Sequence, residues 1–243
     1  MTAPLGKVYL IGAGPGAADL ITVRGARILA QADTVLHDAL VTEEMLALCP
    51  QAIKIPVGKR SGQRSMAQAD INQQIIQSAR KFALVVRLKG GDPMLFGRAD
   101  EELQALEAAG IAVEIVPGIT TAFAAAAATQ QPLTKRGIAR SVAFFTSSAA
   151  PEHPEQTTMP DCDTLVQYMG GREAAATAQK LLSRGRSGTT PVIVVENCSR
   201  ENQKILRLSL MDLAQGLPGM AGPVLVMIGQ AMAQRCTIAS RAS

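Results

Sequence analysis

One short segment, residues 83–98, limits what this 243-residue chain can fold into more than any other. It begins with Ala83-Leu84-Val85-Val86, an apolar run typical of a strand buried in a parallel sheet. The segment then turns within a few residues at Gly90-Gly91-Asp92-Pro93. Paired glycines let a backbone turn sharply and pass close to a ligand, and ligands bind at the carboxyl ends of strands in open α/β sheets. An ordinary β-turn formed by Asp92 and Pro93 is the competing interpretation of these residues alone.

The order of apolar runs predicts an α/β protein. In the first half we expect strands at residues 8–11, 34–36, 53–57, 83–86 and 113–116, with helices at 22–31, 43–48, 71–79, 100–109 and from 122. The helix at 100–109 should turn Leu103 and Leu106 inward. In the second half we expect strands at residues 142–145, 164–169, 192–195, 204–210 and 224–228, with helices at 172–184 and 211–215. Consecutive strands there indicate a mixed sheet, so we expect two α/β domains, residues 1–136 with glycine-rich loops and residues 137–243 with the mixed sheet.

A second glycine-rich loop follows the first expected strand. Gly12, Gly14 and Ala17 fit the spacing of a dinucleotide-binding loop, and Asp38 follows the next strand where a ribose-binding acid would lie. Pro15 argues against this interpretation, because it removes a backbone N–H where a pyrophosphate needs donors. The residues alone therefore leave an NAD-binding oxidoreductase open as an alternative.

Composition excludes several classes of function. Hydrophobic residues make up 47% of the chain, which is enough for a full core, whereas aromatic residues make up 3% and tryptophan is absent, which argues against single-stranded nucleic-acid binding. The four cysteines are scattered and there are two histidines, so we expect no zinc site and a reduced, cytoplasmic setting. No apolar run approaches membrane-spanning length, and the amino terminus lacks the features of a signal peptide. The net charge of +4 favours an acidic ligand.

The loops also form a set in a fixed order. The set comprises Gly-Ala-Gly-Pro-Gly from residue 12, Val-Gly-Lys-Arg from 57, Gly-Gly-Asp-Pro from 90, Phe-Gly-Arg from 96, Pro-Gly-Ile-Thr from 117, Pro-Leu-Thr-Lys-Arg-Gly from 132, Tyr-Met-Gly from 168 and Glu-Asn from 196. Over about residues 7–230 it resembles the tetrapyrrole methylase superfamily, and within it the members that methylate uroporphyrinogen III.

The resemblance implies a fold of two α/β domains with S-adenosylmethionine bound in the cleft between them, in a homodimer. The cofactor contacts that it implies are Pro15, Gly90, Gly91, Asp92, Leu95, Thr120, Thr121, Met169, Cys198, Pro223 and Val224. The implied activity converts uroporphyrinogen III through precorrin-1 to precorrin-2 in sirohaem or cobalamin biosynthesis, with S-adenosylhomocysteine as the second product. A sister enzyme that methylates a later corrinoid intermediate is the alternative. Fused relatives carry a further module that oxidises the product and inserts iron, for which 243 residues leave no room.

The resemblance also assigns a proton acceptor to Asp38 and a proton donor to Lys59. Methyl transfer from a sulfonium needs no metal and no protein nucleophile, but it requires the two reactants to be oriented and a proton to be removed from carbon. A polycarboxylate tetrapyrrole needs cations, for which the sequence offers Arg60, Arg64, Arg98, Lys135 and Arg136. The chain departs from the usual family pattern at His37, Lys135 and Ser147-Ser148, which concern the substrate.

Overall fold

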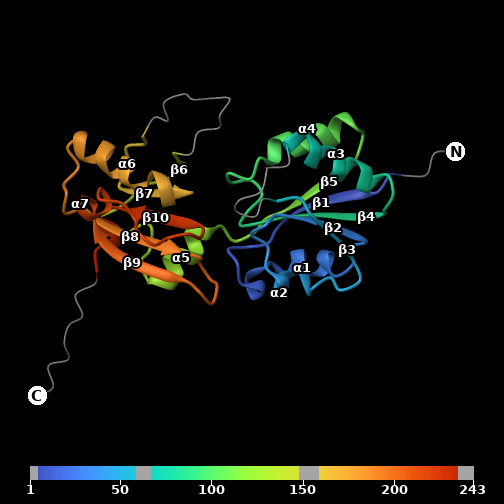
Figure 1. Ribbon diagram of the computed structural model, residues 1–243, viewed down its shortest axis with the longest axis horizontal. Helices are drawn as coiled ribbons and strands as arrows, with labels where there is room; N and C mark the ends of the chain where they lie inside the picture. The colour runs from blue at the N-terminus through green and yellow to red at the C-terminus, as the bar shows by residue number, and fades with distance from the viewer. Residues whose placement is uncertain (1–4, 59–66, 148–158, 235–243) are drawn as a thin grey trace, which may run out of the picture. The chain divides into compact units, whose positions relative to one another are not determined.

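The N-terminal half of the chain builds a sheet of five parallel strands (Figure 1), in the order β3-β2-β4-β1-β5. The computed structural model describes residues 5–58, 67–147 and 159–234. The elements of this half are β1 (Lys7–Gly12), η1 (Ala18–Leu20), α1 (Val23–Leu29), β2 (Thr34–His37), α2 (Glu43–Leu46), β3 (Ile53–Pro56), α3 (Gln68–Ala79), β4 (Leu84–Lys89), α4 (Ala99–Ala108) and β5 (Val113–Val116). The strand predictions for this half are confirmed, and Thr22 caps α1 as expected, its Oγ1 accepting the N–H of Gly25 at 3.1 Å.

Side chains alternate along each strand and so create two cores. Val8 and Leu10 of β1 pack with α3 and α4 on one face, whereas Ile11 packs with α1 and α2 on the other. Figure 1 shows these two pairs of helices on opposite faces of the sheet. Because both faces are covered, the central strands are apolar almost throughout, as the sequence predicted.

The connections of two neighbouring strands leave toward opposite faces of this sheet, which marks the edge where a ligand site is expected. The chain leaves β1 toward α1 on one face, and it leaves the adjacent β4 toward α4 on the opposite face. In open α/β sheets, ligands bind at the carboxyl ends of strands where successive connections diverge in this way. The loops after β1 and β4 are the two glycine-rich loops of the sequence.

The C-terminal half forms the expected mixed sheet, in the order β6-β7-β10-β8-β9. Its β6 and β7 are parallel, and the remaining pairs are antiparallel. Helices α6 and α7 cover one face, and α5 covers the other. The elements are α5 (Thr121–Thr129), β6 (Val142–Thr146), β7 (Thr164–Tyr168), α6 (Gly170–Ser183), β8 (Pro191–Glu196), β9 (Lys204–Ser209), α7 (Leu210–Leu213), β10 (Val224–Ile228) and η2 (Gln230–Met232).

The chain divides into two compact units, Met1–Thr121 and Ala122–Ser243. The sequence placed this division after residue 136. Helix α5 belongs with the second unit because Ala122 and Ala125 are fully buried in the core that contains Val166 and Met227 of the second sheet. No helix in the described part of the chain is long and apolar enough to cross a membrane.

Candidate functional site

The loops that follow β1 and β4 are joined directly through their backbones. The N–H of Gly14 donates to the carbonyl of Gly91 at 3.1 Å, and the N–H of Gly91 donates to the carbonyl of Gly14 at 2.7 Å. This reciprocal pair is an isolated antiparallel bridge at the carboxyl edge of a parallel sheet. It holds both glycine-rich loops in one arrangement.

The loop after β5 packs against the same backbone. A Cβ added at Gly118 would lie 2.2 Å from the carbonyl oxygen of Gly91 and 2.7 Å from the Cα of Gly12. A Cβ added at Gly12 would lie 2.6 Å from Gly118. Gly12 and Gly118 therefore lie at distances that only glycine permits, which explains why both positions are glycine.

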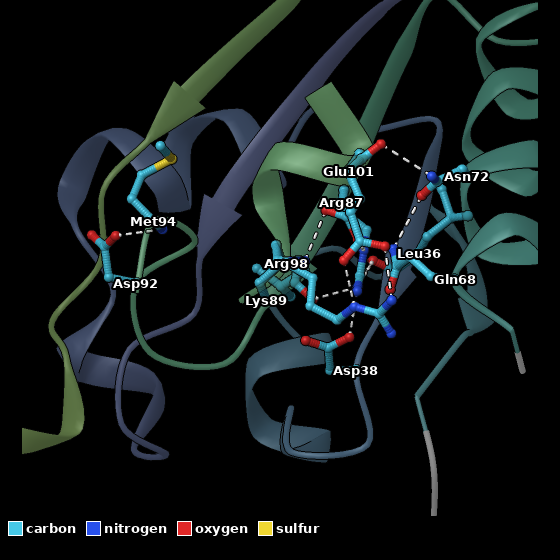
Figure 2. A network of polar contacts seen from close by, with 12 residues as sticks. Leu36, Asp38, Gln68, Asn72, Arg87, Lys89, Asp92, Met94, Arg98 and Glu101 are labelled. Atoms are coloured by element: carbon cyan, nitrogen blue, oxygen red, sulfur yellow. Dashed lines mark hydrogen bonds and ion pairs between the residues drawn. The ribbon is translucent and has the colours of Figure 1, made fainter. Parts of the chain in front are cut away.

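Asp92 fastens two of these loops with its carboxylate. Its Oδ2 accepts the N–H of Gly118 at 2.9 Å, and its Oδ1 accepts the N–H of Met94 at 2.8 Å. Figure 2 shows the second of these bonds. Asp92 is predicted to contact the cofactor, but in this structure both of its carboxylate oxygens accept hydrogen bonds from backbone N–H groups. Asp92 therefore also holds the loops together, a role that the sequence did not reveal.

Gly91 itself faces open space. Its φ is +69°, in the left-handed region that favours glycine. No atom lies within 4 Å of a Cβ built at this position. A side chain here would project away from the three packed loops and occupy space next to them, where a ligand held by these backbones would lie.

The other predicted cofactor residues of this unit lie in the same three loops. Pro15 follows Gly14, and the N–H of Leu95 donates to the carbonyl of Asp92 at 3.3 Å. Thr120 is buried, and Thr121 begins α5, shortly after Gly118. The structure thus gathers the seven predicted positions of the first unit at the ends of β1, β4 and β5, and their contact with a cofactor stays a prediction.

A buried cluster of charges lies beside these loops, on the face of the sheet that α4 covers. Arg87 and Lys89 of β4 are 3% exposed at their side chains, and Glu102 of α4 is 0% exposed. Glu102 Oε1 accepts from Arg87 Nε at 2.9 Å, and Glu102 Oε2 accepts from Lys89 Nζ at 2.8 Å. None of these three residues belongs to the predicted site residues.

Asp38 is the outer member of this cluster. It follows β2, next to β4, and its Oδ1 accepts from an Arg87 terminal nitrogen at 2.5 Å (Figure 2). Its side chain is 29% exposed, so the carboxylate is anchored on its buried side and open on the other.

The cluster changes the pKa values of its two cations. Burial alone would lower the pKa of Arg87, but the carboxylates of Asp38 and Glu102 raise it above its usual value. Burial and the neighbouring Arg87 lower the pKa of Lys89.

The structure describes only some of the residues predicted as proton donor and as substrate-binding cations. Lys59, Arg60 and Arg64 lie outside the described residues. Arg98 is exposed and donates twice to the carboxylate of Glu101, each time at 2.7 Å. Lys135 and Arg136 belong to the second unit, in a turn closed by reciprocal backbone bonds between Lys135 and Ala139.

The predicted cofactor residues of the second unit also share one edge of their sheet. Met169 follows β7, Cys198 follows β8, and Pro223 and Val224 lie at the start of β10. The ladders of β10 with β7 and β8 place the start of β10 beside the ends of those two strands. Met169 is 52% exposed and has a left-handed backbone with φ 56°. Their contact with a cofactor likewise stays a prediction.

Glu196 shapes this second edge. Its Oε1 accepts the N–H groups of Ala221 and Gly222, both at 2.7 Å, directly before Pro223. These backbone donors hold the pKa of Glu196 below its usual value despite its burial. The carboxylate thereby fixes the segment that leads into β10.

Among the described residues, no three His, Cys, Asp or Glu side chains gather as metal ligands.

Most of the chain matches one protein family and is similar to known relatives. Residues 7–214 match the family "Tetrapyrrole (Corrin/Porphyrin) Methylases". The chain is 44% identical over 230 residues to siroheme synthase 2 of Yersinia pestis (strain Pestoides F), covering 93% of this chain and 49% of that protein. The chain thus spans about half the length of that relative.

Two solved structures extend this likeness to three dimensions. Uroporphyrin-III C-methyltransferase from Thermus thermophilus, in complex with S-adenosylhomocysteine, aligns with a TM-score of 0.81 at 36% identity over 95% of this chain and 96% of that one. A cobalamin biosynthetic enzyme, cobalt precorrin-4 methyltransferase, aligns with a TM-score of 0.80 at 30% identity over 94% of this chain and 96% of that one. The family match spans most of the chain and includes the glycine-rich loops of the first unit. This chain belongs to the tetrapyrrole methylase family.

Proposed function

We propose that this protein is an S-adenosylmethionine-dependent C-methyltransferase that converts uroporphyrinogen III through precorrin-1 to precorrin-2. The observation that carries this proposal is the junction of three glycine loops at the carboxyl edge of the first sheet, with Gly91 facing open space. A relative of the same fold, 36% identical to this chain, has been crystallised with S-adenosylhomocysteine, the product that such a cofactor leaves.

The loops of the first unit would hold the cofactor through their backbones. S-adenosylmethionine supplies an electrophilic methyl group when it is bound. Pro15, Gly90, Gly91, Asp92, Leu95, Thr120 and Thr121 are the contacts that we propose in this unit. Because Gly14, Gly91, Asp92 and Gly118 are fixed to one another by hydrogen bonds, the loops need little rearrangement to orient a ligand, and orientation is the main requirement of methyl transfer.

Asp38 is our candidate for the base that removes the proton after methyl transfer. Its carboxylate lies at the same carboxyl edge, is held by Arg87 and remains partly exposed. We assign the proton donor to Lys59 and the substrate carboxylates to Arg60, Arg64, Arg98, Lys135 and Arg136. Arg98 donates two bonds to Glu101, through Nε and one terminal nitrogen, out of the five N–H donors of a guanidinium.

The second unit would contribute Met169, Cys198, Pro223 and Val224 to cofactor binding. Two observations support this assignment. The four residues lie at one edge of the second sheet, and they occur in the family pattern. A homodimer and a cytoplasmic location belong to the same proposal, and we assign no nucleic-acid or membrane partner.

A sister activity on a later corrinoid intermediate is the second candidate. The observation that favours it is the TM-score of 0.80 with cobalt precorrin-4 methyltransferase, close to the 0.81 of the uroporphyrin-III enzyme. The higher sequence identity, 36% against 30%, supports the first candidate. An NAD-binding oxidoreductase gains nothing from the structure, because Pro15 still lacks the N–H that a pyrophosphate would require at that position.

Product analysis decides between these candidates. The purified protein is incubated anaerobically with S-adenosylmethionine and either uroporphyrinogen III or a later corrinoid precursor, and the products are weighed by mass spectrometry. Because each methyl group that is added replaces a proton that leaves, we expect the mass of uroporphyrinogen III to rise by one and then by two CH2 units. Methylation of the corrinoid alone would favour the sister activity. Absence of methylation in every mixture would contradict both.

A further inference from the structure

We propose that Glu102, a residue without any assigned role, is a positioning residue that fixes Arg87 and through it orients Asp38 for proton removal. This inference rests on the proposed function, because it requires Asp38 to act as the base. Glu102 cannot reach substrate itself, since its side chain is completely buried beneath α4.

Both oxygens of Glu102 are occupied by cations. Oε1 accepts from Arg87 Nε at 2.9 Å, and Oε2 accepts from Lys89 Nζ at 2.8 Å. Arg87 and Lys89 lie on the same face of β4, because side chains alternate along a strand. Without the charge of Glu102, these two buried cations would repel each other, so Glu102 determines where the Arg87 guanidinium can lie.

Arg87 carries this constraint to the carboxyl edge of the sheet. One terminal nitrogen donates to the carbonyls of Leu88 at 3.2 Å and Leu36 at 3.5 Å, and the other donates to Asp38 Oδ1 at 2.5 Å. The guanidinium is planar and rigid, so fixing Nε and one terminal nitrogen also fixes the direction of the third. Figure 2 shows Arg87, Lys89 and Asp38 in one cluster, with a dashed line for the bond between Arg87 and Asp38.

The partial exposure of Asp38 distinguishes this cluster from an ion pair that is completely buried. A buried Arg–Glu pair without further contacts adds little stability and can often be replaced by apolar residues. In this cluster the guanidinium extends to a carboxylate that is 29% exposed. Because Arg87 holds Oδ1, we assign proton removal to the other oxygen, Oδ2.

The test uses Glu102→Gln, Asp38→Asn and the double variant in the full chain, with Glu107→Gln as the matched control. Glu107 lies on the exposed side of the same helix and undergoes the same chemical change. For each protein we would measure the melting curve, the affinity for S-adenosylhomocysteine, and kcat and KM for methylation of uroporphyrinogen III.

We expect Glu102→Gln to lower kcat about tenfold, the effect of losing one strongly coupled contact. Its KM values and its affinity for S-adenosylhomocysteine should stay within about twofold of wild type, and Glu107→Gln should change none of these quantities. The decisive readout is the double variant. If Glu102 acts through Asp38, adding Glu102→Gln to Asp38→Asn should cause no further loss of kcat, whereas a purely structural role would make the two losses multiply.

Two results would overturn this inference alone: an unchanged kcat in a folded Glu102→Gln protein, or multiplied losses in the double variant. If Glu102→Gln fails to fold, Glu102→Asp keeps the charge, shortens its reach and is tested in the same double-variant comparison. A wild-type protein that methylates no tetrapyrrole would instead overturn the proposed function, and the positioning role of Glu102 with it.

Discussion

Gly14 and Gly91 exchange two backbone hydrogen bonds, of 3.1 and 2.7 Å, although they lie in loops that follow different strands. The bridge joins the ends of β1 and β4, the neighbouring strands whose connections leave toward opposite faces of the sheet. Gly118 packs against the same point from the loop after β5. The candidate site is therefore a junction of main chains, and the Asp92 side chain holds two of its loops together.

Asp92 tests how the junction is held. Asp92→Ala would leave the N–H groups of Gly118 and Met94 without their acceptors, so we expect the free energy of unfolding to fall by about 1–3 kcal/mol. Affinity for S-adenosylhomocysteine should fall as well, because the loops lose their fixed spacing. Asp92→Asn keeps one carbonyl oxygen and should give intermediate values.

The matched control for Asp92 is Asp100→Ala, which removes an exposed carboxylate from the first turn of α4. It should cost less than about 1 kcal/mol and leave calorimetric binding unchanged. Equal binding by Asp92→Ala and wild type would show that the Asp92 carboxylate is not needed to form the site.

Asp38 tests the proposed chemistry. We expect Asp38→Asn to lower kcat by about 10²–10⁴-fold, the usual contribution of a general acid or base, with little change in affinity for S-adenosylhomocysteine. Lys59→Met should also lower turnover if Lys59 donates a proton, but should raise KM if it only binds a substrate carboxylate.

The Asp38→Asn kinetics need a stability control. Because Arg87 loses a charged partner in Asp38→Asn, melting curves must accompany the kinetics. An unchanged kcat in a folded Asp38→Asn protein would remove Asp38 from the mechanism.

Asp163 predicts a pH dependence of stability in the second unit. Its Oδ2 accepts the N–H of Arg140 at 2.8 Å and the N–H and hydroxyl of Ser141 at 3.0 and 2.8 Å, and these donors hold the pKa of Asp163 below its usual value. A carboxylate with a lowered folded-state pKa stabilises the protein above its unfolded-state pKa, and this contribution is lost as the pH falls through the folded-state pKa.

The measurement is urea unfolding of wild type and Asp163→Asn between pH 3 and pH 7. Above about pH 5 the variant should be less stable by a constant amount, and the difference should shrink as the pH falls below the usual range of aspartate, near 4. A difference that does not change with pH would mean that the ionised form of Asp163 gives no special stability.

Cys198 makes a chemical prediction. Burial raises the pKa of its thiol to about 11, so very little thiolate exists at pH 8. We expect iodoacetamide to label Cys198 slowly in the folded protein and Cys162, which is half-buried, more quickly. Peptide mass mapping after a short reaction, with a urea-unfolded sample as reference, measures both rates. Labelling of Cys198 at the unfolded rate would contradict the burial of its thiol.

Much of this architecture could be predicted because strands of a sheet that is covered on both faces are nearly continuous in apolar residues. The runs at Val8–Ile11 and Val224–Ile228 have this character, and both are strands in the structure. The sharp turn at Gly91, where φ is +69°, could be predicted too, because paired glycines directly after a strand let the backbone turn sharply.

The charged cluster was harder to foresee because its partners lie on different elements. Glu102 follows Asp100 and Glu101, and such an acidic run resembles the solvated start of a helix. The available signal was periodicity: Glu102 and Leu106 are four residues apart, and both are buried on the face of α4 that meets the sheet. Arg87 alternates with Val86 and Leu88 along β4, which turns it toward that helix. The pairing of Asp92 with Gly118 is a contact between separate loops, for which the local sequence carries no pattern.

The most direct test of the account is calorimetric binding of S-adenosylhomocysteine to wild type, Gly91→Val and Gly110→Val. Both glycines have a positive φ, +69° and +67°, and a Cβ at either would meet no atom within 4 Å. The two substitutions should therefore cost similar stability, about 1–3 kcal/mol for a strained backbone position. Only Gly91 lies at the junction of the three loops, so Gly91→Val should lose binding almost completely while Gly110→Val binds like wild type. A folded Gly91→Val protein with wild-type affinity would contradict the account, because the cofactor would then lie elsewhere.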